Sequence, residues 1–104
     1  MAELMSEARV ACRTPAEGRD GVTNIPTWKF EILRSAILDV LREGEIAFKD
    51  LKNLAGAKLN KDELERLGSL GWHVTTVKLE LEVRGEVERV PDRMPQVIRL
   101  GRAA

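Results

Sequence analysis

Few side chains of this chain have the chemistry of a catalytic or metal-binding site. Among its 104 residues, His73 is the only histidine, Cys12 is the only cysteine, and tyrosine is absent. Nucleophilic catalysis needs a base within hydrogen-bond reach of the nucleophile, and zinc sites need clustered cysteines and histidines. One residue of each type does not form such a cluster, and no glycine-rich phosphate loop occurs. We therefore expect no enzymatic activity, no metal and no cofactor.

A second group of side chains has the chemistry to contact nucleic acid. Polar residues that could meet base edges or phosphates gather in one short segment: His73, Thr75, Thr76 and Lys78. Four arginines follow that could hold backbone phosphates: Arg84, Arg89, Arg93 and Arg99. Two carboxylates of the same region, Glu80 and Glu82, would face DNA unfavourably. An ordinary solvated surface would use the same threonines and arginines.

The overall charge does not favour a dedicated nucleic-acid binder. Lysine plus arginine and aspartate plus glutamate both number 17, so the formal net charge is zero. Such binders usually carry a basic excess, because neutralising phosphates supplies much of the affinity. With 43% hydrophobic and 33% charged residues, the composition is typical of one folded domain.

The single cysteine and the hydropathy pattern indicate where the protein works. One cysteine cannot form an intrachain disulfide, which fits a reducing compartment. No apolar run approaches the roughly 20 residues that cross a bilayer. The first residues also lack the basic start and long apolar run of a signal peptide. We expect a cytoplasmic protein with no membrane association.

The elements that must position these side chains follow from the spacing of apolar residues. Residues 1–26 contain two prolines and two glycines and predict an extended or partly disordered arm, with a short strand near Ala8–Cys12. The folded domain is expected over residues 27–104, beginning with Thr27 as helix N-cap. Apolar residues at helical spacing predict a first helix over 28–43, ended by Gly44. They are Phe30, Leu33, Ile37, Val40 and Leu41.

Three short elements are predicted next. They are a β-prone link over residues 45–48, a second helix over 49–57 and a third over 61–67. Leu51, Leu54 and Ala55 turn inward in the second helix. Asn60 and Glu63 resemble the capping box that opens a helix.

Residues 72–84 fit two different elements. Alternation of Val77, Leu79, Leu81 and Val83 with charged residues is typical of a half-buried strand. On a helical wheel the segment has two opposed apolar faces, one with Val74, Val77 and Leu81 and the other with Trp72, Leu79 and Val83. The length of the segment and the following glycine favour the helix. Its second face then needs a cover, which could be the arm, a wing or another copy of the protein, so Trp72, Leu79 and Val83 form a candidate interface.

The C-terminal region predicts a β-hairpin, and with the preceding segment it carries a resemblance. Strands are expected over 86–91 and 96–100. The most specific stretches are Gly71-Trp72, Val74-Thr75-Thr76-Val77-Lys78-Leu79, Leu81-Glu82, Arg84-Gly85 and Glu88-Arg89-Val90-Pro91. Over roughly residues 23 to 100 the chain resembles a family of short bacterial winged-helix proteins of unknown function. The resemblance implies an α+β winged helix-turn-helix fold, with three core helices, room for one extra short helix, and the two-stranded hairpin as the wing. It implies no catalytic or ligand residues.

Two functions fit this expected fold. In winged-helix proteins the third core helix enters the major groove and the wing reaches the DNA backbone. We therefore expect double-stranded DNA as the partner, bound by a small transcriptional regulator or accessory factor that is weak or dimer-dependent because its net charge is zero. The alternative is a protein-interaction or homodimerisation module with no DNA contact. Basic side chains gathered on one face would favour DNA, whereas exposed Glu80 and Glu82 would favour the module.

Overall fold

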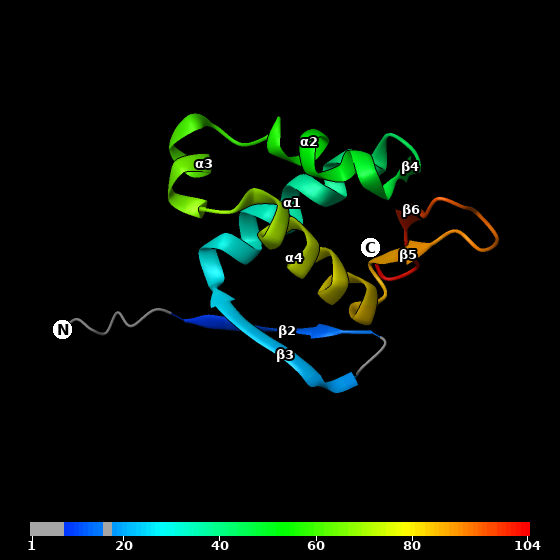
Figure 1. The fold of residues 1–104 in the computed structure, drawn as a ribbon, viewed down its shortest axis with the longest axis horizontal. Helices are drawn as coiled ribbons and strands as arrows, with labels where there is room; N and C mark the ends of the chain where they lie inside the picture. The colour runs from blue at the N-terminus through cyan, green and yellow to red at the C-terminus, as the bar shows by residue number, and fades with distance from the viewer. Residues whose placement is uncertain (1–7, 16–17) are drawn as a thin grey trace.

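The computed structural model describes residues 8–15 and 18–104, which form an α+β arrangement of helices flanked by two small antiparallel sheets (Figure 1). The elements, in chain order, are β2 (Arg9–Thr14), β3 (Gly18–Pro26), α1 (Thr27–Arg42), β4 (Ile46–Ala47), the 3-10 turn η1 (Phe48–Asp50), α2 (Leu51–Gly56), α3 (Lys61–Leu67), α4 (Leu70–Arg84), β5 (Val87–Arg89) and β6 (Val97–Leu100). Helices α1 and α4 pack against each other and carry much of the core.

Helix α1 follows the sequence prediction closely. Its expected apolar residues are buried, with Phe30, Leu33 and Ile37 at most 1% exposed. The start differs in one detail, because Thr27 is the first helical residue rather than the N-cap. The backbone N–H of Thr27 instead donates a 3.0 Å hydrogen bond to the carbonyl oxygen of Ala8, just before β2. The N-terminal segment therefore supplies what a capping side chain would have supplied.

The short helices confirm part of the prediction. Asn60 and Glu63 form the expected capping box of α3, with hydrogen bonds of 2.7 and 2.9 Å between each side chain and the other residue's backbone N–H. The predicted second helix begins as the 3-10 turn η1 and becomes α-helical only at Leu51. Leu54, expected to turn inward, is 42% exposed, so that prediction is wrong.

The ambiguous segment is helical. Ser69 caps α4 by accepting a 3.2 Å hydrogen bond from the backbone N–H of Trp72. Gly85 ends the helix in a left-handed conformation, with φ of 80°, which glycine adopts without strain. Helix α4 crosses the front of α1 and leads directly into the C-terminal sheet (Figure 1).

The C-terminal sheet contains the predicted two-stranded hairpin and, as a third strand, β4 from the link that the sequence marks as β-prone. Strand β6 pairs with β5 on one edge and with the short β4 on the other, in the order β4-β6-β5. Ile98 of β6 is fully buried and faces Ile46 of β4 across the register. This apolar pair accounts for the recruitment of the link between α1 and η1 as a third strand.

The N-terminal region forms a second sheet. Strands β2 and β3 pair as an antiparallel hairpin, with Val10 opposite Ile25 and Cys12 opposite Thr23. Cys12 and Ile25 are each only 2% exposed, and the hairpin packs on α1 and α4 (Figure 1). The expectation of an extended or partly disordered arm also covered residues 1–7, which lie outside the described residues. The hairpin therefore packs on α4, but the second apolar face of that helix remains partly exposed.

Candidate functional site

The carboxylate of Glu80 is buried where α4 meets β2. Arg13 donates to it from its backbone N at 2.8 Å and from its guanidinium at 3.0 and 2.7 Å. Arg84 donates from Nε at 2.7 Å. Burial alone would raise the pKa of Glu80, but the hydrogen bonds from both arginines outweigh it and hold that pKa at about 2. Glu80 therefore stays ionised and binds the hairpin to the helix.

Lys78 is buried on another side of α4, against the C-terminal sheet and η1. Its side chain is 2% exposed, and Nζ donates a 2.7 Å hydrogen bond to Oε1 of Gln96. Nζ also forms an ion pair with Glu82 and lies 4.4 Å from the centre of the Phe48 ring. Burial lowers the pKa of Lys78, and the hydrogen bond that Lys78 donates to Glu82 opposes that effect. Lys78 thus joins α4 to neighbouring elements instead of extending into solvent.

The four arginines expected to hold phosphates each pair with a carboxylate. The shortest distances are Arg84–Glu80 2.7 Å, Arg89–Glu82 3.0 Å, Arg93–Glu45 3.1 Å and Arg99–Glu88 2.5 Å. The pairs of Arg93 and Arg99 are exposed and therefore weak, whereas Arg84 and Arg89 hold buried carboxylates, and each of the four pairs cancels local positive charge. The arginines lie on four different segments: the end of α4, each of the two strands of the hairpin, and its connecting loop. The structure therefore does not bring them together as one unpaired basic cluster.

Of the predicted DNA-contacting residues near the start of α4, only the two threonines reach the surface. His73 is 8% exposed, and its Nδ1 lies 2.7 Å from the carbonyl oxygen of Ser69. The imidazole also meets the Trp72 ring edge-on, with 4.8 Å between the ring centres. Thr75 is exposed and Thr76 half-buried.

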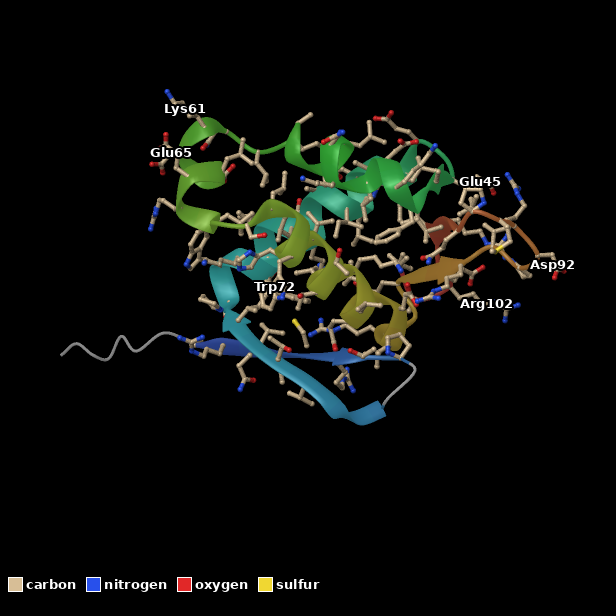
Figure 2. All side chains as sticks on the ribbon, viewed as in Figure 1. Glu45, Lys61, Glu65, Trp72, Asp92 and Arg102 are labelled. Atoms are coloured by element: carbon tan, nitrogen blue, oxygen red, sulfur yellow. The ribbon has the colours of Figure 1, made fainter. Side chains whose placement is uncertain are left out.

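The outer face of α4 carries an apolar stripe, which we call the α4 seam: Trp72, Thr76, Leu79 and Val83. Intervals of four, three and four residues place these side chains on one helix face. Trp72, labelled in Figure 2, lies in the first turn of α4. Its side chain is 50% exposed, and the other three are partly exposed. The structure thus brings together the three residues of the predicted interface and adds Thr76, which sequence reasoning had assigned to DNA. Neither the N-terminal hairpin nor the C-terminal sheet covers the seam fully.

A surface groove lies elsewhere, between the end of α1, β4 and α2. Its volume is about 440 Å³, and Val40, Ile46 and the exposed Leu54 form its apolar wall. Lys58 and Glu43, 3.9 Å apart, lie at its polar side. The sequence offered one signal for this groove, the apolar Leu54 in a short helix, and we interpreted that residue as core.

The described residues define a small α+β domain whose central charged groups are paired internally and whose last helix carries a partly exposed apolar stripe. The chain belongs to DUF6958, a family of unknown function whose model matches residues 9–98. Comparison with curated proteins and with solved structures gave no match. Within the described part of the chain, no helix has the length and apolar character needed to span a membrane.

Proposed function

We propose that this protein is a protein-interaction module of winged-helix fold that contacts its partner through the α4 seam. The fold part of the proposal rests on the element order and on β4, the short strand after α1 that joins the C-terminal hairpin. Many winged-helix proteins place a small strand at this point in the chain. The N-terminal hairpin is an addition that leaves this order intact.

The observation that carries the function is the partly exposed apolar stripe of the seam, with Trp72 as its most exposed side chain. Trp72 is half exposed, whereas Val74, Val77 and Leu81 of the same helix are buried. Tryptophan is enriched among the residues that dominate binding energy at protein interfaces. Leu79 and Val83 extend the apolar surface along the same face. Covering this stripe with a partner would remove apolar area from water and so favour association.

The same face is poorly suited to reading DNA. Major-groove recognition relies chiefly on arginine, lysine, asparagine and glutamine. The seam and the neighbouring Thr75 contribute threonines as their only polar side chains. Lys78 is buried, and the arginines of the wing already hold carboxylates. These placements support a protein partner over DNA.

Site-specific photo-crosslinking tests the proposal. A benzoylphenylalanine at Thr75, which borders the seam, should crosslink to protein in cells of the source organism. The matched control is the same photo-crosslinker at Glu65, on the exposed side of α3 (Figure 2). We expect a protein adduct from position 75 and none from position 65. Crosslinks to nucleic acid, or none from position 75, would contradict the proposal.

DNA binding, as a small transcriptional regulator or accessory factor, is the second candidate, and one placement favours it. Lys52 is exposed beside the first turn of α4, where a β-carbon at Gly71 would lie 3.6 Å from its Cδ, and Lys49, three residues earlier in the chain, is also exposed. Helices in this position can hold DNA phosphates. Fluorescence anisotropy of a labelled random duplex, at low and near-physiological salt, tests this candidate. Binding that weakens steeply with salt, and that is lost with Lys49→Glu plus Lys52→Glu, would support DNA binding. No binding at tens of micromolar at low salt would exclude it.

A further inference from the structure

The spacing of the α4 seam is the same when read in either direction. Trp72, Thr76, Leu79 and Val83 are separated by four, three and four residues. Alternating intervals of four and three are those of a coiled-coil seam. Because the sequence of intervals is symmetric, a second copy of the helix can lie against it in antiparallel orientation about a two-fold axis. We propose that the partner of the seam is a second copy of this chain, an inference that rests on the proposed function.

Side-chain sizes favour the antiparallel arrangement over the parallel one. An antiparallel pair places Trp72 opposite Val83 of the second copy, and Thr76 opposite Leu79. Each contact then joins a larger side chain to a smaller one, which is how facing layers interdigitate. A parallel pair would place Trp72 against Trp72 and Thr76 against Thr76. An isologous two-fold contact of this kind is the commonest symmetry of homo-oligomers.

The charges beside the seam are compatible with a copy of the same chain. Glu80 is fully buried and held by Arg13 and Arg84. The side chain of Glu82 is 9% exposed and paired with Lys78 and Arg89. Two copies therefore bring no unpaired α4 carboxylates together, and the chain as a whole has zero net charge. A strongly charged partner would gain little from carboxylates that are already neutralised.

Sedimentation equilibrium from about 5 µM to about 500 µM is the main test. Four seam residues per copy make a small contact, so we expect a dissociation constant in the micromolar range. Thr76→Arg places a charge at the centre of the seam and should weaken the dimer at least about tenfold. Asn53→Arg, an exposed position on α2, is the matched control and should leave the dimer unchanged. Circular dichroism of both variants verifies that each is folded.

The orientation has its own test. In a mixture of isotope-labelled and unlabelled protein, intermolecular NOEs should connect the Trp72 ring of one copy to the Val83 methyl groups of the other. NOEs between the two Trp72 rings would overturn the antiparallel orientation, and a dimer that Thr76→Arg leaves intact would overturn the inference that the seam forms the contact.

The crosslinking and sedimentation results together separate the two proposals. A protein that stays monomeric at about 500 µM, yet crosslinks from position 75 to a different protein, would overturn the second-copy inference and leave the interaction module standing. A monomer that gives no protein crosslink from position 75 would overturn both the interaction module and the second-copy inference.

Discussion

Glu80 holds two parts of the molecule together through one buried side chain. Its carboxylate accepts hydrogen bonds from Arg13 of β2 and Arg84 of α4. Glu80→Gln keeps the shape but removes the charge, so both arginines lose their ionic partner. Since their side chains are 46% and 36% exposed and can be solvated, we expect a loss of about 2 to 3 kcal/mol in the free energy of unfolding. Urea denaturation at pH 7 measures this loss.

The comparison for that prediction is Glu88→Gln. Glu88 pairs with Arg99 at the surface, where both side chains are more than a third exposed. Exposed pairs of this kind contribute about 0 to 1 kcal/mol. Equal losses from the two substitutions would contradict the role assigned to Glu80.

Glu80 also makes stability depend on pH in the acid range. Folding lowers its pKa from an ordinary value of 4.5 to about 2. The unfolded chain therefore takes up the proton first, so the stabilisation is complete above about pH 5 and disappears as the pH falls towards 2. We expect this one group to contribute about 3 kcal/mol of that decline. Denaturation midpoints between pH 7 and 2 measure it, and a slope that Glu80→Gln does not reduce would contradict the assignment.

At the residue scale, the sequence alone indicates only those ion pairs of Glu80 and Lys78 whose partners lie on the same helix. The pairs Glu80–Arg84 and Lys78–Glu82 are four residues apart on a helix, a spacing that brings side chains together. Their other partners are distant, with Arg13 67 residues before Glu80 and Gln96 18 residues after Lys78. Without those partners, charged residues on a helix are normally assigned to the surface. That is why Lys78 was a candidate DNA contact.

At the element scale, the N-terminal hairpin should control access to Cys12. Burial, and then the charge of Glu80, raise the pKa of the Cys12 thiol to about 11 from an ordinary 9.0. The reactive thiolate at pH 8 is then about a hundredfold scarcer than in the unfolded chain. We expect native protein to react with iodoacetamide at least about a hundredfold more slowly than protein in urea. Mass spectrometry of timed samples measures both rates.

A variant that loosens the hairpin without changing its charge sharpens this test. Ile25 lies on β3, is 2% exposed and belongs to the same core cluster as Cys12. Truncating a buried isoleucine typically costs about 2 to 5 kcal/mol. Ile25→Ala should therefore speed labelling of Cys12. Equal rates in native and unfolded protein would show that the hairpin does not remain docked.

The long helices were predictable from the sequence, whereas the strands, which depend on pairing with distant parts of the chain, were less so. Helices α1 and α4 were predicted within about two residues of their observed ends. The apolar residues of α1 recur at helical spacing, whereas for α4 the length of the segment and the glycine after it favoured a helix over a strand. The extent of β3 was missed, since its glycines and final proline suggested a break. Its pairing with β2 depends on packing against α1 and α4, which local patterns do not report. The third strand of the C-terminal sheet depends in the same way on the pairing of β4 with β6.

The whole molecule combines zero net charge with internal pairing of the charges on its last helix. Seven charged side chains of α4 and the wing could attract or repel a polyanion such as DNA, but each of them is paired with another of the seven or with a residue nearby. They are Lys78, Glu80, Glu82, Arg84, Arg89, Arg93 and Arg99. What α4 presents to a partner is then mainly the apolar α4 seam. Association through such a surface and association through phosphates respond differently to salt.

Salt dependence therefore distinguishes the two candidate functions for the intact protein. Contact through Trp72, Leu79 and Val83 removes apolar area from water and involves no release of counterions. We expect the dimer dissociation constant to change less than about threefold between 50 mM and 500 mM NaCl. A phosphate-mediated complex would weaken by orders of magnitude over the same range, because each neutralised phosphate releases a counterion. Sedimentation equilibrium at several salt concentrations measures the first case and duplex anisotropy the second. A dimer that dissociates as salt rises would mean that exposed ion pairs such as Arg99–Glu88 exchange partners between copies, and the seam would no longer account for the contact.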